Sequence, residues 1–186
     1  AILLTKKDAV EPVTEEVTFD FNVMNHAVSS SNSNAGDIPA EGEVFEAKNV
    51  TLTVTANPWG STPNRFWNQN GPQLRMYGGS LELVAAEGKA ITNVVFNHNG
   101  KWGANTVNEI AIPNDTENND ATWTPAEGEE LTTEVVVAIA ANSQINSIVV
   151  TVDEAPEAPE DAIDPDGLTY NFDDGTLQGW TSIDAE

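Results

Sequence analysis

Short runs in which apolar and polar residues alternate are the feature that most limits how this chain can fold. The clearest run spans 14–23, where the side chains of Val17, Phe19, Phe21 and Val23 are expected to face the core and the polar residues between them to face the other way. Further strand segments are expected at 44–56, 74–84, 91–96, 131–140 and 145–152. No long segment has the 3.6-residue period of an amphipathic helix. The sequence therefore predicts an all-β fold, an antiparallel β-sandwich of the jelly-roll kind.

A Gly78-Gly79 pair separates two of these runs. Two-residue hairpin turns need positive φ angles, which glycine adopts easily. The pair therefore predicts a β-hairpin with arms at 74–77 and 80–84, on which Arg75 and Tyr77 face outward as neighbours.

Four parts are expected along the chain. They are an N-terminal linker or edge strand at 1–12, the sandwich module at 13–152, an acidic Pro-rich linker at 153–167 and the beginning of a second β module at 168–186. Within 153–166 half the residues are acidic and three are proline, which favours an extended, stiff spacer. Residues 168–173 then repeat the residue types of 17–22 position by position, although two alternating strands can also look alike by chance. We expect the chain to be a piece of a larger protein.

Charge and composition exclude several classes of function. The chain has 30 acidic and 7 basic residues, a net charge of −23, which argues against binding nucleic acid or an anionic membrane surface. Solubility is the plainest reason for such acidity. There is no cysteine, so disulfides, thiolate catalysis and zinc fingers are ruled out. No apolar run is long enough for membrane insertion.

Enzyme motifs are missing from the sequence as well. It has no Gly-x-Ser-x-Gly elbow, no HExxH motif and no phosphate loop. The many acidic residues leave glycoside hydrolysis by a pair of carboxylates as an alternative. We expect a non-catalytic module.

The stretch 59–77 concentrates the side chains suited to ligand binding. It holds two of the five tryptophans and the only two arginines. Glycine, proline and amide residues interrupt it, so loops and one short strand are expected to hold these groups near the surface. With one further tryptophan, the predicted ligand-binding residues are Trp59, Arg65, Trp67, Asn68, Arg75, Tyr77 and Trp102.

Each of these residue types has a carbohydrate-binding use and a structural one. Indole rings can stack on the apolar face of a sugar, and arginine and amide groups can bind its hydroxyls. A tryptophan is as often part of the core, an arginine often pairs with a carboxylate of its own chain, and asparagine is common in turns. Phe66 and Trp67 are adjacent, so on a strand only one of them faces out. Trp123 is expected in the core. For His98, the sequence indicates a metal-binding or catalytic role only weakly.

Calcium is the one metal that the sequence favours. Asp115, Glu117, Asn119 and Asp120 bring hard oxygen ligands together in one loop. Their spacing is not that of an EF-hand. Asp115 and Asp120 are the predicted ligands within the sandwich module.

The last residues resemble a known family. The start at Tyr170-Asn171-Phe172-Asp173, the Gly179-Trp180 pair and Ile183-Asp184-Ala185 are similar to the opening of cleaved-adhesin domains, which are jelly-roll modules of gingipains, haemagglutinins and other surface proteins of anaerobic Bacteroidetes. The match covers under a tenth of the chain. It implies that Asp173 is a structural calcium ligand.

Residues 13–152 resemble, more loosely, β-sandwich modules of secreted proteins from the same bacteria. Phe66-Trp67, 74–77, 91–96, Trp123-Thr124 and 145–152 carry this likeness. It implies a secreted or cell-surface location in a multimodular protein whose neighbouring modules are partners.

Two functions are weighed from these observations. The first is a carbohydrate-binding module whose partner is a polysaccharide or glycan. The alternative is an adhesin or structural spacer that contacts protein and positions its neighbouring modules. An enzyme ranks third.

Overall fold

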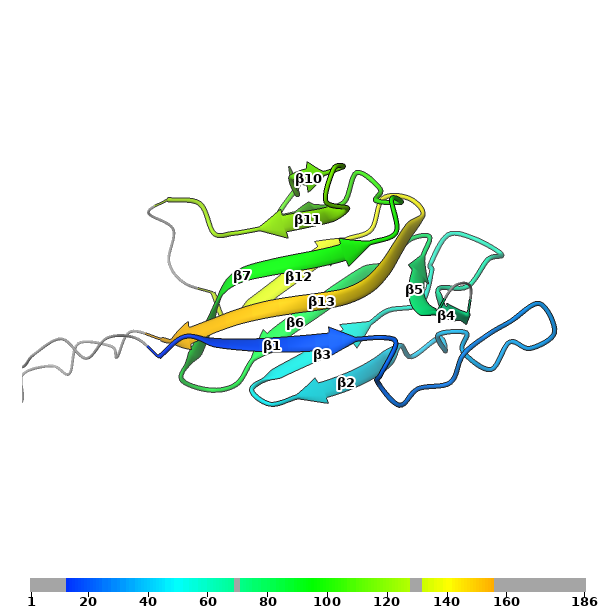
Figure 1. The fold of residues 1–186 in the computed structure, drawn as a ribbon, viewed down its shortest axis with the longest axis horizontal. Coiled ribbons are helices and arrows are strands. Elements are labelled where there is room, and N and C mark those ends of the chain that lie inside the picture. Colours follow the sequence, from blue (N-terminus) through cyan, green and yellow to red (C-terminus); the bar gives the residue numbers. More distant parts are fainter. Residues whose placement is uncertain (1–12, 69–70, 128–131, 156–186) are drawn as a thin grey trace, which may run out of the picture. The chain divides into compact units, whose positions relative to one another are not determined.

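Two antiparallel β-sheets face each other in the computed structural model, which describes residues 13–68, 71–127 and 132–155 (Figure 1). The seven-stranded sheet runs in the order β10 (Asn114–Asp115), β11 (Asp120–Trp123), β7 (Lys89–His98), β13 (Ser143–Glu154), β5 (Pro72–Met76) and β4 (Arg65–Asn68), with β1 (Glu15–Asp20) also paired to β13. The six-stranded sheet runs in the order β2 (Glu43–Ala47), β3 (Val50–Val54), β6 (Ser80–Ala85), β12 (Glu134–Ala138), β8 (Thr106–Val107) and β9 (Ile110–Ala111). The predicted all-β antiparallel sandwich is confirmed.

Strand β13 pairs with three other strands of the seven-stranded sheet. It is 12 residues long and pairs with β7 along one edge. Along its other edge, Ser143–Ile145 pair with β5 and Ser147–Val152 pair with β1. One strand near the end of the described chain therefore joins elements from its beginning and its middle.

Alternation along the strands builds the core between the sheets. Val17 and Phe19 of β1, Leu52 of β3 and Ile148 of β13 are at most 1% exposed, while the residues between them face outward. Burying such side chains is the main source of stability in a sandwich. The core contains 27 buried hydrophobic residues in one cluster, so the described chain folds around a single core.

The first predicted strand is shorter than its sequence pattern. Strand β1 ends at Asp20, because the Asp20 carbonyl accepts hydrogen bonds from the backbone N–H of Val23 (3.1 Å) and Met24 (3.0 Å) and closes a turn. Phe21 is still fully buried, but Val23 is 79% exposed. The prediction that Val23 faces the core was wrong.

The predicted Gly78-Gly79 hairpin was also wrong. Strand β5 belongs to the seven-stranded sheet and β6 to the six-stranded sheet, so the two glycines connect the layers. Only Gly79 has a positive φ, of 81°. A Cβ on Gly79 would lie 2.6 Å from the carbonyl oxygen of Ala56, so a close backbone approach as well as the φ angle requires glycine there.

A single buried amide joins two of the connections between the sheets, the one from β3 to β4 and the one from β5 to β6. The side-chain Nδ2 of Asn64 donates hydrogen bonds to the carbonyl oxygens of Thr55 and Gly78, both at 2.8 Å. Its Oδ1 accepts the backbone N–H of Tyr77 at 2.7 Å. Asn64 is 0% exposed and fixes where β4 begins and β5 ends.

Only part of the predicted domain layout falls on the described residues. Strand β13 continues through Asp153 and Glu154, which pair with Ala90 and Lys89, so the last strand runs two residues past the expected end at Val152. The N-terminal linker at 1–12, most of the linker at 153–167 and the second module at 168–186 lie outside the described residues. In the described ranges, no helix has the length and apolar character needed to span a membrane.

The buried amide gives a stability prediction. We expect Asn64→Ala to lower the free energy of unfolding by about 2–4 kcal/mol, because it leaves one buried and two part-buried backbone groups without their partner. Urea denaturation measures the change. The matched control is Asn32→Ala on an exposed loop, expected within about 0.5 kcal/mol of the parent chain. Equal effects of the two substitutions would contradict the role given to Asn64.

Candidate functional site

The outward face of β4 and β5 carries the candidate site. On β4, Phe66 is 0% exposed and points into the core, so Arg65 and Trp67 on either side of it point out. On β5, Leu74 and Met76 are buried as predicted, and Gln73 and Arg75 point out. The outward residues of the two strands form one continuous surface.

Strand pairing places these four side chains in two rows. Arg65 lies directly opposite Arg75, and Trp67 lies directly opposite Gln73. The guanidinium carbon of Arg65 is 5.5 Å from the centre of the Trp67 ring, and that of Arg75 is 5.3 Å from it. These distances allow cation–π attraction. The structure therefore brings the only two arginines of the chain onto one indole ring.

An amide cluster extends this surface across β13 to the end of β7. The Nδ2 of Asn99 donates hydrogen bonds to the Oε1 of Gln73 at 2.6 Å and to the Oε1 of Gln144 at 2.7 Å. Gln73 is 2% exposed and Gln144 is 7% exposed, whereas Asn99 is exposed. Gln144 is also the cross-strand partner of Arg75. We call the six residues Arg65, Trp67, Gln73, Arg75, Asn99 and Gln144 the Trp67 platform.

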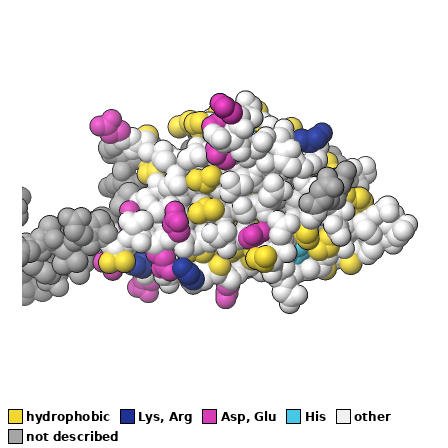
Figure 2. Space-filling view, in the orientation of Figure 1, with side chains coloured by type: hydrophobic (Ala, Val, Ile, Leu, Met, Phe, Trp, Pro, Cys, Tyr) yellow, Lys and Arg dark blue, Asp and Glu magenta, His cyan; other side chains and the backbone are white. Residues whose placement is uncertain are grey.

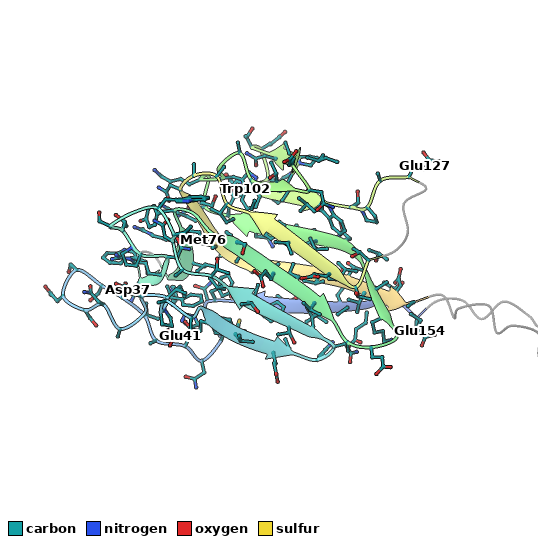
Figure 3. All side chains as sticks on the ribbon, turned by 180° about the vertical axis from the view of Figure 1, so that it is seen from behind. Asp37, Glu41, Met76, Trp102, Glu127 and Glu154 are labelled. Carbon is teal, nitrogen blue, oxygen red and sulfur yellow. The ribbon has the colours of Figure 1, made fainter. Side chains whose placement is uncertain are left out.

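The segment 29–38 covers the edge of β4 and holds it in place. The backbone N–H of Ser29 donates to the carbonyl of Phe66 (2.7 Å), and the N–H of Phe66 donates to the carbonyl of Gly36 (2.8 Å). The same segment supplies Asp37, whose Oδ1 lies 3.3 Å from the Nε of Arg65 and accepts the hydroxyl of Ser29 at 2.8 Å. Asp37 lies at this end of the sandwich in Figure 3. The covered edge prevents strand addition there and fixes Arg65.

Three other predicted ligand residues lie around the ends of β4 and β5. Asn68 is exposed at the end of β4, and Tyr77 is partly exposed just after β5. Trp59 is 78% exposed on the loop between β3 and β4, and its backbone N–H donates to Asn57 at 3.1 Å. A Cβ on Gly78 would lie 3.0 Å from the indole of Trp59. Trp59 is therefore an exposed aromatic side chain on an ordered loop.

Trp102 is placed against the core, apart from the platform. Its ring lies 5.2 Å from the ring of Phe96 and stacks on His98 at 5.8 Å. The Nδ1 of His98 accepts the backbone N–H of Gly100, which makes its Nε2 the donor to the Oδ1 of Asn114 at 2.9 Å. Both ring nitrogens of His98 are thereby used in local structure, and Trp102 is suited to packing.

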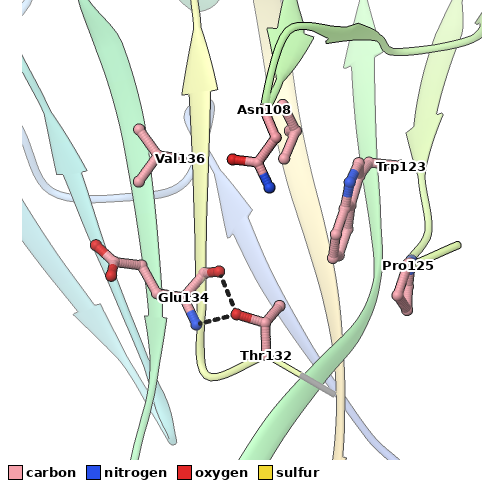
Figure 4. Close-up of a pocket in the computed structure, with 7 residues that line it drawn as sticks. Asn108, Trp123, Pro125, Thr132, Glu134 and Val136 are labelled. Atoms are coloured by element: carbon pink, nitrogen blue, oxygen red, sulfur yellow. Dashed lines mark hydrogen bonds between the residues drawn. The ribbon is translucent and has the colours of Figure 1, made fainter. Parts of the chain in front are cut away.

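Trp123 lines a surface cleft, although the sequence predicted it in the core. It packs against the core cluster and also forms a wall of a cavity of about 500 Å³ (Figure 4). The other lining residues are Val107, Asn108, Pro125, Thr132, Glu134 and Val136. Asn108 and Glu109 have φ angles of 50° and 66° and form the turn between β8 and β9. The cleft depends on where β8, β11 and β12 meet, so no local sequence signal marks it.

The predicted calcium ligands lie on a two-strand ribbon at the edge of the sheet. Asp115 and Asp120 are opposite each other across β10 and β11. The Asp115 carboxylate accepts the side-chain amide of Asn118 (2.7 Å) and the backbone N–H groups of Asn118 and Glu117, and these bonds lower its pKa. Among the described residues, no group of three or more His, Cys, Asp or Glu side chains is placed to hold a metal ion. Calcium at Asp115 and Asp120 stays a prediction, and Asp173 lies outside the described residues.

Comparison of the chain with models of protein families, with curated proteins and with solved structures gave no match. The likeness to modules of Bacteroidetes surface proteins therefore stays a prediction, and the fold is established by the structure itself.

Substitution of two tryptophans tests the placement of Trp102 against the core and of Trp59 at the surface. We expect Trp102→Ala to lower the free energy of unfolding by about 2–3 kcal/mol, somewhat less than the usual loss for a fully buried tryptophan, because Trp102 is partly exposed. Trp59→Ala serves as the matched substitution at an exposed site and should change stability by about 0.5 kcal/mol or less. Chemical denaturation monitored by circular dichroism measures both. A larger loss for Trp59→Ala would contradict the assignment.

Proposed function

We propose that this chain is a non-catalytic carbohydrate-binding module and that the Trp67 platform is its binding surface. The observation that carries the proposal is the position of Trp67. Its partly exposed indole lies on the outward face of the seven-stranded sheet, with two guanidinium groups over its ring and an amide cluster next to it.

The platform offers the two kinds of contact that a sugar ring needs. An indole ring takes the apolar C–H face of a pyranose, and neighbouring amides and guanidinium groups exchange hydrogen bonds with its hydroxyls. Gln73 and Gln144 are already fixed by their hydrogen bonds to Asn99. Because strands and fixed side chains hold the surface, little conformational entropy is lost on binding.

The proposal includes no chemical step. The sequence has no cysteine and none of the nucleophile or metalloprotease motifs, and the platform residues are suited to hydrogen bonding and stacking. A glycan or polysaccharide is the proposed partner. A secreted or cell-surface protein with neighbouring modules is the proposed setting, on the strength of the sequence resemblance.

A second candidate function is protein contact by an adhesin or spacer module. Trp59 supports it, since an indole that is 78% exposed on an ordered loop is a typical anchor for a partner protein. The two candidates depend on different tryptophans, Trp67 and Trp59, which allows one experiment to separate them.

The experiment is a glycan array followed by isothermal titration calorimetry on the strongest ligands. We expect Trp67→Ala to weaken binding by about 1–3 kcal/mol, a 5- to 150-fold rise in Kd, because it removes the stacking surface. Trp59→Ala is the matched control and should leave the Kd within about twofold.

Thermal denaturation checks that both variants stay folded. The proposed function fails if the parent chain binds no glycan. The placement of the site fails if Trp59→Ala abolishes binding while Trp67→Ala does not.

A further inference from the structure

The two arginines concentrate positive charge at one place on the outward face of the seven-stranded sheet. They are the only arginines in a chain with 30 acidic residues. They lie directly opposite each other on β4 and β5, and like charges at directly opposed positions of an antiparallel pair repel. Both side chains lie on the outward face, so packing of the core does not require them. The arrangement favours a role in binding negative charge.

The protein itself shows that a carboxylate fits beside one of them. Asp37 approaches the Nε of Arg65 at 3.3 Å, and the carbonyl of Pro63 accepts from the same Nε at 3.4 Å. In the part of the chain that the structure describes, both acceptors of Arg65 therefore use Nε, which leaves its two terminal amino groups as donors for a ligand. A guanidinium fork matches carboxylate and sulfate oxygens better than an ammonium group does.

The charge of the whole molecule restricts which anions can bind. Acidic side chains are scattered over the face seen in Figure 2, with basic ones at only a few places, and the net charge of −23 repels a polyanion as it approaches. At 0.15 M salt this repulsion is screened beyond about 8 Å. A ligand with one anionic group among neutral sugars meets the local guanidinium groups while avoiding most of the repulsion.

We propose that the Trp67 platform selects saccharides that carry an isolated anionic group, a uronate carboxylate or a sulfate ester, within an otherwise neutral chain. The inference rests on the proposed carbohydrate-binding function and names its ligand class. One sugar ring stacks on Trp67 while its anionic group meets Arg65 and Arg75. The exposed amide of Asn99, held by Gln73 and Gln144, binds the hydroxyls of the neighbouring neutral sugars.

The test compares four saccharides by calorimetry at 150 mM NaCl. The probes are xylotetraose, xylotriose carrying one glucuronic acid, xylotetraose carrying one sulfate ester, and tetragalacturonic acid. We expect at least one of the singly charged probes to bind about tenfold more tightly than both xylotetraose and the fully charged tetragalacturonic acid. The difference between the uronate and sulfate probes identifies the anion.

Variants then test whether the arginines produce the preference. Arg75→Gln should weaken binding of the singly charged probe about tenfold and change xylotetraose binding by about twofold or less. Arg75→Lys keeps the charge but not the planar fork, and an intermediate loss is expected. Lys48→Gln is the matched control, because it removes the same charge from the turn between β2 and β3 and should leave the preference unchanged.

The possible failures can be told apart. Equal binding of neutral and singly charged probes, or an unchanged preference in Arg75→Gln, would overturn the anionic selectivity and leave carbohydrate binding intact. If no probe and no array glycan binds the parent chain, both the selectivity and the proposed function are overturned. Thermal denaturation shows which variants fold. If Arg75→Gln is unfolded, the anionic selectivity is decided by the comparison of probes on the parent chain and by the Arg75→Lys variant.

Discussion

Burial of Phe66 is the interaction on which the candidate site depends. Its side chain is fully buried and contacts the rings of Phe21 and Phe45, with centres 5.3 and 5.4 Å away. Because neighbouring residues on a strand face opposite sides, this anchor forces Arg65 and Trp67 onto the outer face. Burial of Leu74 and Met76 on β5 has the same effect on Gln73 and Arg75. The ligand surface is thus the outer side of a well-packed part of the core.

The connections around this pair of strands give the surface its rigidity. Asn64 joins the two crossings between the sheets just before β4 and just after β5. The segment 29–38 closes the free edge of β4 and delivers Asp37 to Arg65. On the other side, β13 pairs with β5 and brings Gln144 beside Arg75. The site is therefore assembled from four parts of the chain that are distant in sequence.

That assembly explains what could be predicted from the sequence and what could not. Local alternation was enough to predict the sandwich, the buried faces of β1 and β5, and the choice of one inward and one outward residue between Phe66 and Trp67. Which strands pair is set by long-range contacts, so the Gly78-Gly79 connection was mistaken for a hairpin when it crosses between sheets. For the same reason no local sequence pattern indicated that Arg65 and Arg75 meet at Trp67, that Gln144 joins them, or that Trp123 borders a cleft. The turn closed by Asp20 shows that backbone hydrogen bonds can also end a strand before its alternating pattern does.

Ligand binding at Trp67 is tested most directly by a ¹H–¹⁵N NMR titration that follows the indole N–H signals of the five tryptophans. Single Trp→Phe variants assign the signals, and a saccharide found to bind is added to saturation. We expect the Trp67 indole signal to shift most, while those of Trp102 and Trp123 stay in place. An unchanged Trp67 signal alongside a shifted Trp59 or Trp123 signal would contradict this expectation and move the binding site elsewhere on the sandwich.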